Sequence, residues 1–195
     1  MVAALALLFV TMTLLRPAGA SHDLRGGESH AYRDNPPLAH TGGFGEPTCR
    51  FCHAGSELNL EPGTLSIVDV PAVIEPGSAY TIIVELRRPE LAAAGFELAI
   101  RDTTGASYGV LLSGGAETDV RRHHSGVDYA FHTLVGTNPI SAEVARWAVR
   151  WKTPDTLRGD AVLSAAANAA NADNSEFGDA IYQASVVVPT AGDGP

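Results

Sequence analysis

The residues best suited to chemistry stand together in EPTCRFCH, residues 46–53. This segment contains both cysteines of the 195-residue chain, Cys49 and Cys52, and His53 follows the second cysteine directly. Cys-x-x-Cys-His is the pattern of covalent haem c attachment, because its spacing lets the thiols form thioethers with two neighbouring vinyl groups while the histidine reaches the iron. The sequence therefore predicts that Cys49 and Cys52 bind haem c covalently and that His53 is the proximal iron ligand.

Two other interpretations of the cysteine pair stay open. Zinc could use Cys49, Cys52 and a histidine, but a closed structural zinc site needs four ligands and the chain has no second Cys-x-x-Cys. A thiol–disulfide redox pair usually lies at a helix start in an α/β fold, and this sequence lacks that alternation of strands and helices. Haem is favoured over both.

A distal iron ligand must come from elsewhere in the chain. Both methionines, Met1 and Met12, fall within a predicted signal peptide, so a histidine–methionine pair is excluded if that peptide is removed. His132 is the candidate distal ligand, because the strand-like segment 127–133 would hold its ring rigidly. His40, nine residues before Cys49, is the alternative distal ligand or a haem contact. The predicted iron ligands are thus His53 and His132, a pair that generally gives a lower potential than histidine–methionine ligation.

The remaining histidines are weaker candidates: His22, His30, His123 and His124. His123 and His124 would point to opposite sides of a strand, so at most one of them could bind iron.

The N-terminus predicts export. Residues 2–15 form an apolar run too short to span a bilayer comfortably, and Ala18-Gly19-Ala20 has the small-x-small form of a cleavage site. We expect a signal peptide at 1–20, a flexible leader at 21–39, no membrane anchor in the mature chain, and a periplasmic or extracellular location.

Beyond this leader, the expected organisation is a haem-attachment segment at 40–63, a β-sandwich at 64–190 and a tail at 191–195. The 20 glycines and 12 prolines favour turns over long helices. Period-two alternation is clearest at 145–152, where Trp147, Val149 and Trp151 share one face. The predicted strands are 65–70, 80–87, 96–101, 108–113, 127–133, 145–152, 161–165 and 181–188. Seven or eight such strands predict an all-β, immunoglobulin-like antiparallel sandwich with an extended N-terminal haem-binding loop.

Two segments and the charge add further expectations. The segment 164–172 is ambiguous between helix and turn, and the polar residues between Asn168 and Asp179 are expected to form a hydrogen-bonded turn rather than a calcium site.

A net charge of -9 with a single lysine, Lys152, argues against nucleic acid as a partner. Hydrolase and nucleotide-binding motifs are absent from the sequence.

Several motifs together resemble the bacterial choice-of-anchor V domain, which is similar to the Reeler (reelin-type) β-sandwich. They are HTGGFGEPTCRFCH at 40–53, IEPGSAYTIIVEL at 74–86, GFELAIRD at 95–102, WAVRWKTP at 147–154 and NAANADNSEFGDAIY at 168–182. The resemblance implies an exported domain with a haem-attachment motif at Cys49, Cys52 and His53. His40 and His132 match histidine positions of that family.

Three functions follow as hypotheses. The first is an exported monohaem c-type cytochrome-like protein, an electron carrier rather than an enzyme, working with a redox partner protein. The alternative is an extracellular Reeler-like binding or adhesion module whose cysteine pair is a structural clip or metal site. A third is a haem enzyme or gas sensor with an open sixth coordination position.

Overall fold

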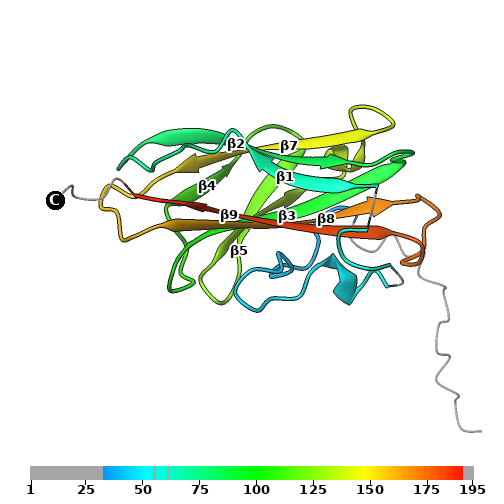
Figure 1. Ribbon diagram of the computed structural model, residues 1–195, viewed down its shortest axis with the longest axis horizontal. Helices are drawn as coiled ribbons and strands as arrows, with labels where there is room; N and C mark the ends of the chain where they lie inside the picture. Colours follow the sequence, from blue (N-terminus) through cyan, green and yellow to red (C-terminus); the bar gives the residue numbers. More distant parts are fainter. Residues whose placement is uncertain (1–32, 55, 61, 191–195) are drawn as a thin grey trace, which may run out of the picture.

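Two antiparallel sheets packed face to face form the protein (Figure 1). The computed structural model describes residues 33–54, 56–60 and 62–190. The first sheet has the order β1 (Thr64–Val68), β2 (Ala79–Arg87), β7 (Val144–Lys152) and β4 (Val110–Ser113). The second has the order β5 (Thr118–Arg122), β6 (Asp128–His132), β3 (Ala93–Asp102), β8 (Ala161–Ala170) and β9 (Ala180–Val188). The predicted all-β sandwich is confirmed, with nine strands in the described part of the chain.

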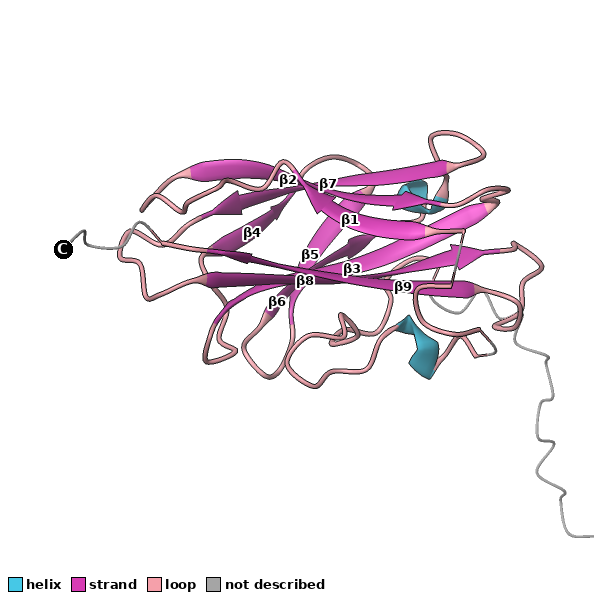
Figure 2. Cartoon of the chain, viewed as in Figure 1, coloured by secondary structure: helices cyan, strands magenta, loops and turns pink. Residues whose placement is uncertain are grey.

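Helix is limited to two short 3-10 turns in the described residues, η1 (Cys49–Phe51) and η2 (Val135–Thr137) (Figure 2). Within these residues no helix is long and apolar enough to cross a membrane. The predicted signal peptide, the leader up to residue 32 and the tail at 191–195 lie outside the described residues.

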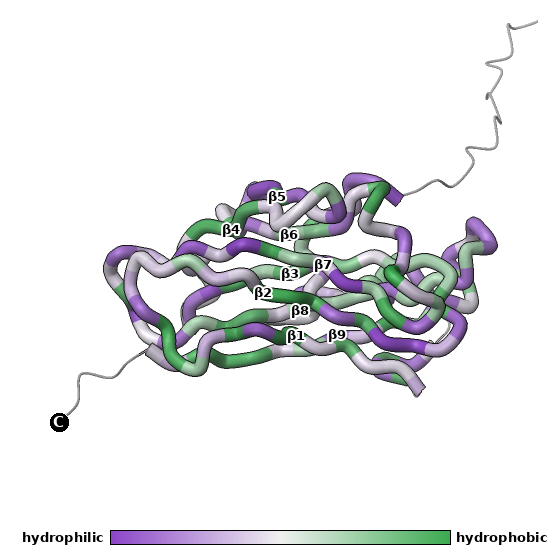
Figure 3. The backbone as a smooth tube through the Cα atoms, turned by 90° about the horizontal axis from the view of Figure 1, so that it is seen from above, coloured by the Kyte–Doolittle hydropathy of each residue, from purple (hydrophilic) through white to green (hydrophobic). Residues whose placement is uncertain are grey.

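The core lies between the sheets and depends on strict alternation along β7. Trp147, Val149 and Trp151 are buried, while Arg146, Arg150 and Lys152 face solvent, as the sequence predicts. Both indole nitrogens find acceptors, with Trp147 donating to Gly136 O at 2.8 Å and Trp151 to Tyr108 O at 2.7 Å. Apolar stretches run along strands such as β2, and hydrophilic residues gather in many of the connections (Figure 3).

Two strands differ from the sequence prediction. The prediction missed β5 (Thr118–Arg122), because Val120 is its only aliphatic residue and no alternation is visible. Strand β8 continues through the ambiguous Ala/Asn segment to Ala170, and almost all of its residues are buried. Small alanines suit a strand covered on both faces, so tertiary packing decides a segment whose local preferences are mixed.

The outer face of the five-stranded sheet is covered by residues 33–54 and 56–60, the N-terminal cover, drawn in blue and cyan beneath β8 and β9 in Figure 1. Leu38 and Ala39 pack there against Ala99, Val127 and Tyr129, which form a second, smaller apolar cluster. This N-terminal cover lies very close to the sheet, since a Cβ added at Gly43 would come within 2.4 Å of Ser164 Oγ. The absence of a side chain at Gly43 leaves room for the side chain of Ser164.

Candidate functional site

One tight helical turn carries the Cys-x-x-Cys-His motif. The Thr48 hydroxyl caps it by accepting from Arg50 N, and the amides of Cys52 and His53 both donate to Cys49 O, at 3.2 and 2.9 Å. Residues at i, i+3 and i+4 lie on one side of such a turn. Cys49, Cys52 and His53 therefore face the same way, and the intervening Arg50 and Phe51 are exposed to solvent.

The side of the turn that carries the thiols and the imidazole faces a cavity of about 330 Å³. The cavity lies on the outer face of the five-stranded sheet, over small residues of β3 and β8 that include Ala93, Gly95 and Ala170. Its lining includes every residue that the sequence assigns to the haem site: His40, Cys49, Cys52, His53 and His132. The fold thus brings His132, 79 positions after His53 in the sequence, to the same cavity as the motif.

The imidazole of His132 is held at the end of β6. Its Nδ1 lies 3.1 Å from Phe96 N and 3.2 Å from Phe96 O, and the residue is only 8% exposed. The ring lies against Gly95, where an added Cβ would come within 2.7 Å of His132 Cε1. In the tautomer that donates from Nδ1 to Phe96 O, Nε2 carries the lone pair that a metal would use.

His40 reaches the cavity from the N-terminal cover. Its backbone N–H donates to Glu97 Oε2 at 2.7 Å, and its ring Nδ1 lies 3.0 Å from Leu38 O. The ring also lies 5.7 Å from that of Phe51. The backbone fixes the position of His40, so its side chain is not needed to anchor the loop.

The two thiols are free and half-buried in the structure. Burial, together with the negative charge of Glu97, raises the pKa of Cys49 to about 12. Redox-active thiols have the opposite property, because their chemistry requires a thiolate near neutral pH. Cys49 therefore remains a protonated thiol.

The ring of His53 is held by a carboxylate that the sequence does not place there. Its Nδ1 donates to Asp179 Oδ2 at 2.6 Å, and Asn168 Nδ2 donates to the same oxygen at 2.9 Å. We expected Asn168 and Asp179 to belong to a hydrogen-bonded turn, and the loop from Asn171 to Phe177 is indeed internally hydrogen-bonded. However, Asn168 lies on β8, Asp179 is 1% exposed, and both face the cavity. In the sequence, the only sign of their position at the cavity is that both residues are polar and stand beside the ends of buried strands.

The other histidines lie elsewhere. His123 and His124 follow β5 in a turn, and their ring centroids are 3.8 Å apart, so they do not point to opposite sides as a strand would require. Neither lines the cavity. His22 and His30 lie outside the described residues.

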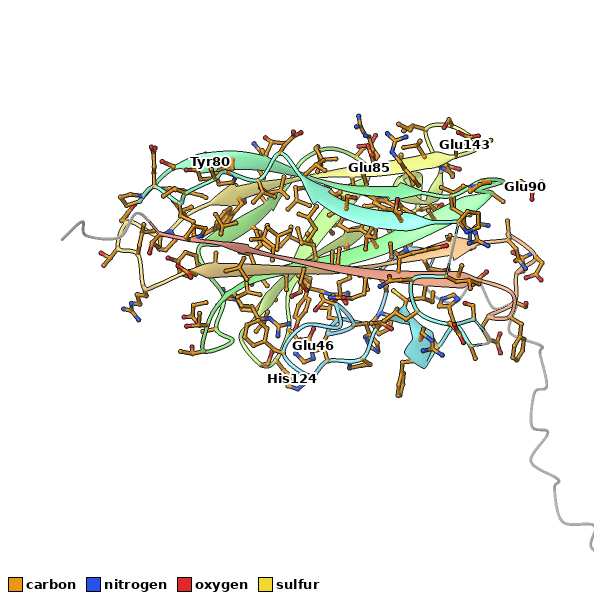
Figure 4. The ribbon with its side chains drawn as sticks, in the orientation of Figure 1. Glu46, Tyr80, Glu85, Glu90, His124 and Glu143 are labelled. Atoms are coloured by element: carbon orange, nitrogen blue, oxygen red, sulfur yellow. The ribbon has the colours of Figure 1, made fainter. Side chains whose placement is uncertain are left out.

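Two carboxylates, the buried Glu97 and the half-buried Glu46, attach the N-terminal cover to the sheet. Glu97 on β3 accepts from the backbone of Ala39 and His40, and burial raises its pKa to about 8. Glu46 accepts from both Arg101 and Tyr129, and Arg101 also donates to the Tyr129 hydroxyl at 2.7 Å. Glu46 lies on the side of the sandwich that carries this loop, whereas Tyr80, Glu85 and Glu143 lie on the opposite side (Figure 4). These contacts fix the loop that carries the motif.

No group of three or more His, Cys, Asp or Glu side chains is arranged to hold a bare metal ion in the part of the chain that the structure describes.

Comparison with known proteins identifies no family. No protein-family model and no curated protein matches the sequence. Among solved structures, the chain is similar to the human F-spondin reeler domain (16% identity, TM-score 0.43, 66% of this chain and 87% of that one). It is also similar to the Reelin-N domain of F-spondin (17%, TM-score 0.45, 73% and 94%). A third match is a cohesin module from a Clostridium perfringens family 33 glycoside hydrolase (16%, TM-score 0.40, 66% and 94%). Because these identities and TM-scores are low, the sandwich is established by the strand pairing of this chain and not by the similarity.

Proposed function

We propose that this chain is an exported monohaem c-type cytochrome-like protein that carries electrons to or from a redox partner protein outside the cytoplasm. One observation carries the proposal: a single cavity is lined by both thiols and the histidine of the attachment motif, and also by His132 from a different strand. Export follows from the signal-like N-terminus of the sequence.

The residues present fit haem in three respects. The cavity has small and apolar side chains over the sheet, among them Ala93, Gly95 and Ala170, which suit a flat macrocycle. The thiols of Cys49 and Cys52 would each add S–H across a vinyl C=C bond. This addition forms a thioether without a leaving group and does not require a thiolate bound to the iron. The imidazole of His53 is oriented by a carboxylate at Nδ1, as is usual for histidines that bind metals.

His53 and His132 are the residues that would hold the iron. Haem supplies one-electron transfer when bound, and two histidine ligands without methionine give it a comparatively low potential. The contacts of Glu97 and Glu46 keep the attachment loop on the sheet. An electron carrier benefits from such rigidity, because its ligands then stay in place in both oxidation states.

Attachment is tested by expressing the full chain, residues 1–195, together with a cytochrome c maturation system. We expect a reduced pyridine haemochrome spectrum and a mass equal to the processed protein plus one haem. The double variant Cys49→Ser/Cys52→Ser should lose covalent haem, whereas Arg50→Ala, between the cysteines but exposed to solvent, should keep it. A colourless protein of apo mass would contradict the proposal and favour the binding-module alternative.

A further inference from the structure

Asp179 and His53 make the longest-range polar contact of the site, and the attachment motif itself does not predict it. The two residues are 126 positions apart, and Asp179 directly precedes β9. Asp179 Oδ2 lies 2.6 Å from His53 Nδ1. The carboxylate is 1% exposed, whereas the imidazole is 26% exposed and lines the cavity. A buried acceptor thus faces the ring nitrogen that an iron ligand does not use.

The carboxylate of Asp179 is held at both oxygens. Asn168 Nδ2 donates to Oδ2 at 2.9 Å, and the backbone N–H of Asn171 donates to Oδ1 at 3.1 Å. Ser56 Oγ additionally donates to the backbone carbonyl of Asp179 at 2.6 Å, which ties the attachment loop to the same point. The side chain therefore cannot rotate away from His53 without losing hydrogen bonds in the interior.

The negative charge of Asp179 is directed at His53. Among the described residues, the carboxylate lies against the His53 ring and pairs with no arginine or lysine. Asn168 must present its amide nitrogen to this carboxylate, because its oxygen would meet an acceptor, and Asn168 Oδ1 is consequently buried without a partner. An unpartnered buried acceptor is costly, so the hydrogen bond to Asp179 is made at the expense of Asn168 Oδ1.

We propose that Asp179 is a positioning residue that fixes the His53 tautomer and lowers the potential of the bound haem. An ionised carboxylate can only accept, so Nδ1 keeps its proton and Nε2 keeps the lone pair for iron. Partial transfer of that proton toward Asp179 raises the basicity of the imidazole, and a more basic ligand stabilises ferric over ferrous iron. The inference rests on the proposed haem function and adds to it a residue that sets the redox poise.

The test compares Asp179→Asn with Asp173→Asn in the haem-loaded full chain. Both variants remove one carboxylate from the β8–β9 connection, but Asp173 is exposed and contacts only its own loop. Asparagine at 179 keeps one acceptor oxygen without the charge. We expect Asp179→Asn to shift the ferrous-to-ferric ratio at a fixed potential toward ferrous by about tenfold, a rise of about 59 mV in midpoint potential for one electron. The g-values of the ferric EPR spectrum should change in the same variant, because they report electron donation by the axial imidazole. Asp173→Asn should leave both measurements at the wild-type values.

The outcomes separate the two proposals. A wild-type protein without covalent haem overturns the proposed function and this inference together. Haem-loaded wild type with an unchanged or lower potential in Asp179→Asn overturns the inference alone. If Asp179→Asn gives no folded protein, Asn168→Ala decides the question. Asn168 Nδ2 lies 2.9 Å from Asp179 Oδ2 and 3.0 Å from His53 Nδ1, so its removal leaves Asp179 to accept from His53 without this competing donor. The potential should then fall, and an unchanged or higher potential would overturn the inference.

Discussion

The imidazole of His132 lies directly against Gly95, so closely that a methyl group at Gly95 would come within 2.7 Å of the ring. The contact joins the end of β6 to β3 at the edge of the cavity. Nδ1 of the same ring is bound to the backbone of Phe96. His132 therefore has a fixed position because Gly95 leaves room for it.

Gly95→Ala should displace the His132 ring. Overpacking of a buried site typically costs about 1–3 kcal/mol, and we expect a loss of that size in the free energy of unfolding, measured by urea denaturation. Gly115→Ala is the control, because only the flexible end of Glu117 lies near its added Cβ. A Gly95→Ala protein as stable as wild type, with an unchanged haem spectrum, would show that the ring is not held by this contact.

His132→Ala should convert the haem-loaded protein from a low-spin to a high-spin absorption spectrum, because it removes the proposed distal ligand. His40→Ala is the matched control. It removes the alternative distal imidazole at the cavity, and the backbone N–H of residue 40 can still donate to Glu97. If His40→Ala becomes high-spin while His132→Ala stays low-spin, the distal ligand is His40.

Glu46→Gln should weaken the attachment of the N-terminal cover. The Glu46 carboxylate accepts from Arg101, which is 4% exposed, and its loss would leave a buried guanidinium without its ion-pair partner. Breaking a buried ion pair in this way costs about 3 kcal/mol. The expected result is a correspondingly lower free energy of unfolding in urea. Asp128→Asn breaks the pair with Arg122, whose side chain is 66% exposed, and should cost no more than about 1 kcal/mol. Equal losses in the two variants would contradict the structural role of Glu46.

The sequence predicts best where a local pattern decides the structure. Alternation along residues 145–152 predicts β7 and its buried face, because a half-buried strand requires that period. The spacing of Cys49, Cys52 and His53 likewise predicts that they act together, and one helical turn is enough to align them.

Contacts between distant segments could not be predicted in the same way. No spacing rule connects His53 with Asp179, or His40 with Glu97, because the folded sheet alone brings these pairs together. Strand β5 pairs with β6 although it has little apolar character of its own. The sequence shows Asp and Glu beside apolar strands. Which groups these carboxylates bind once they are buried depends on the way the N-terminal cover crosses the sheet.

Glu97 should make the stability of the protein depend on pH. Burial raises its pKa from 4.5 to about 8, so between these values the folded protein keeps a proton that the unfolded chain releases. The folded state then binds more protons than the unfolded state, and stability falls as pH rises. The contribution is fully present below about pH 4.5 and is lost as the pH passes through about 8.

Glu97→Gln isolates this effect, because glutamine stays neutral at every pH and still offers one oxygen to the backbone of Ala39 or His40. We expect the free energy of unfolding of wild type to fall relative to that of Glu97→Gln by a few kcal/mol between pH 5 and pH 8.5, measured by urea denaturation in steps of pH. Glu57→Gln, at an exposed position of the same cover, should follow the wild-type profile. A constant difference between wild type and Glu97→Gln across this range would mean that Glu97 is ionised in the folded protein throughout, and that the two backbone donors outweigh its burial.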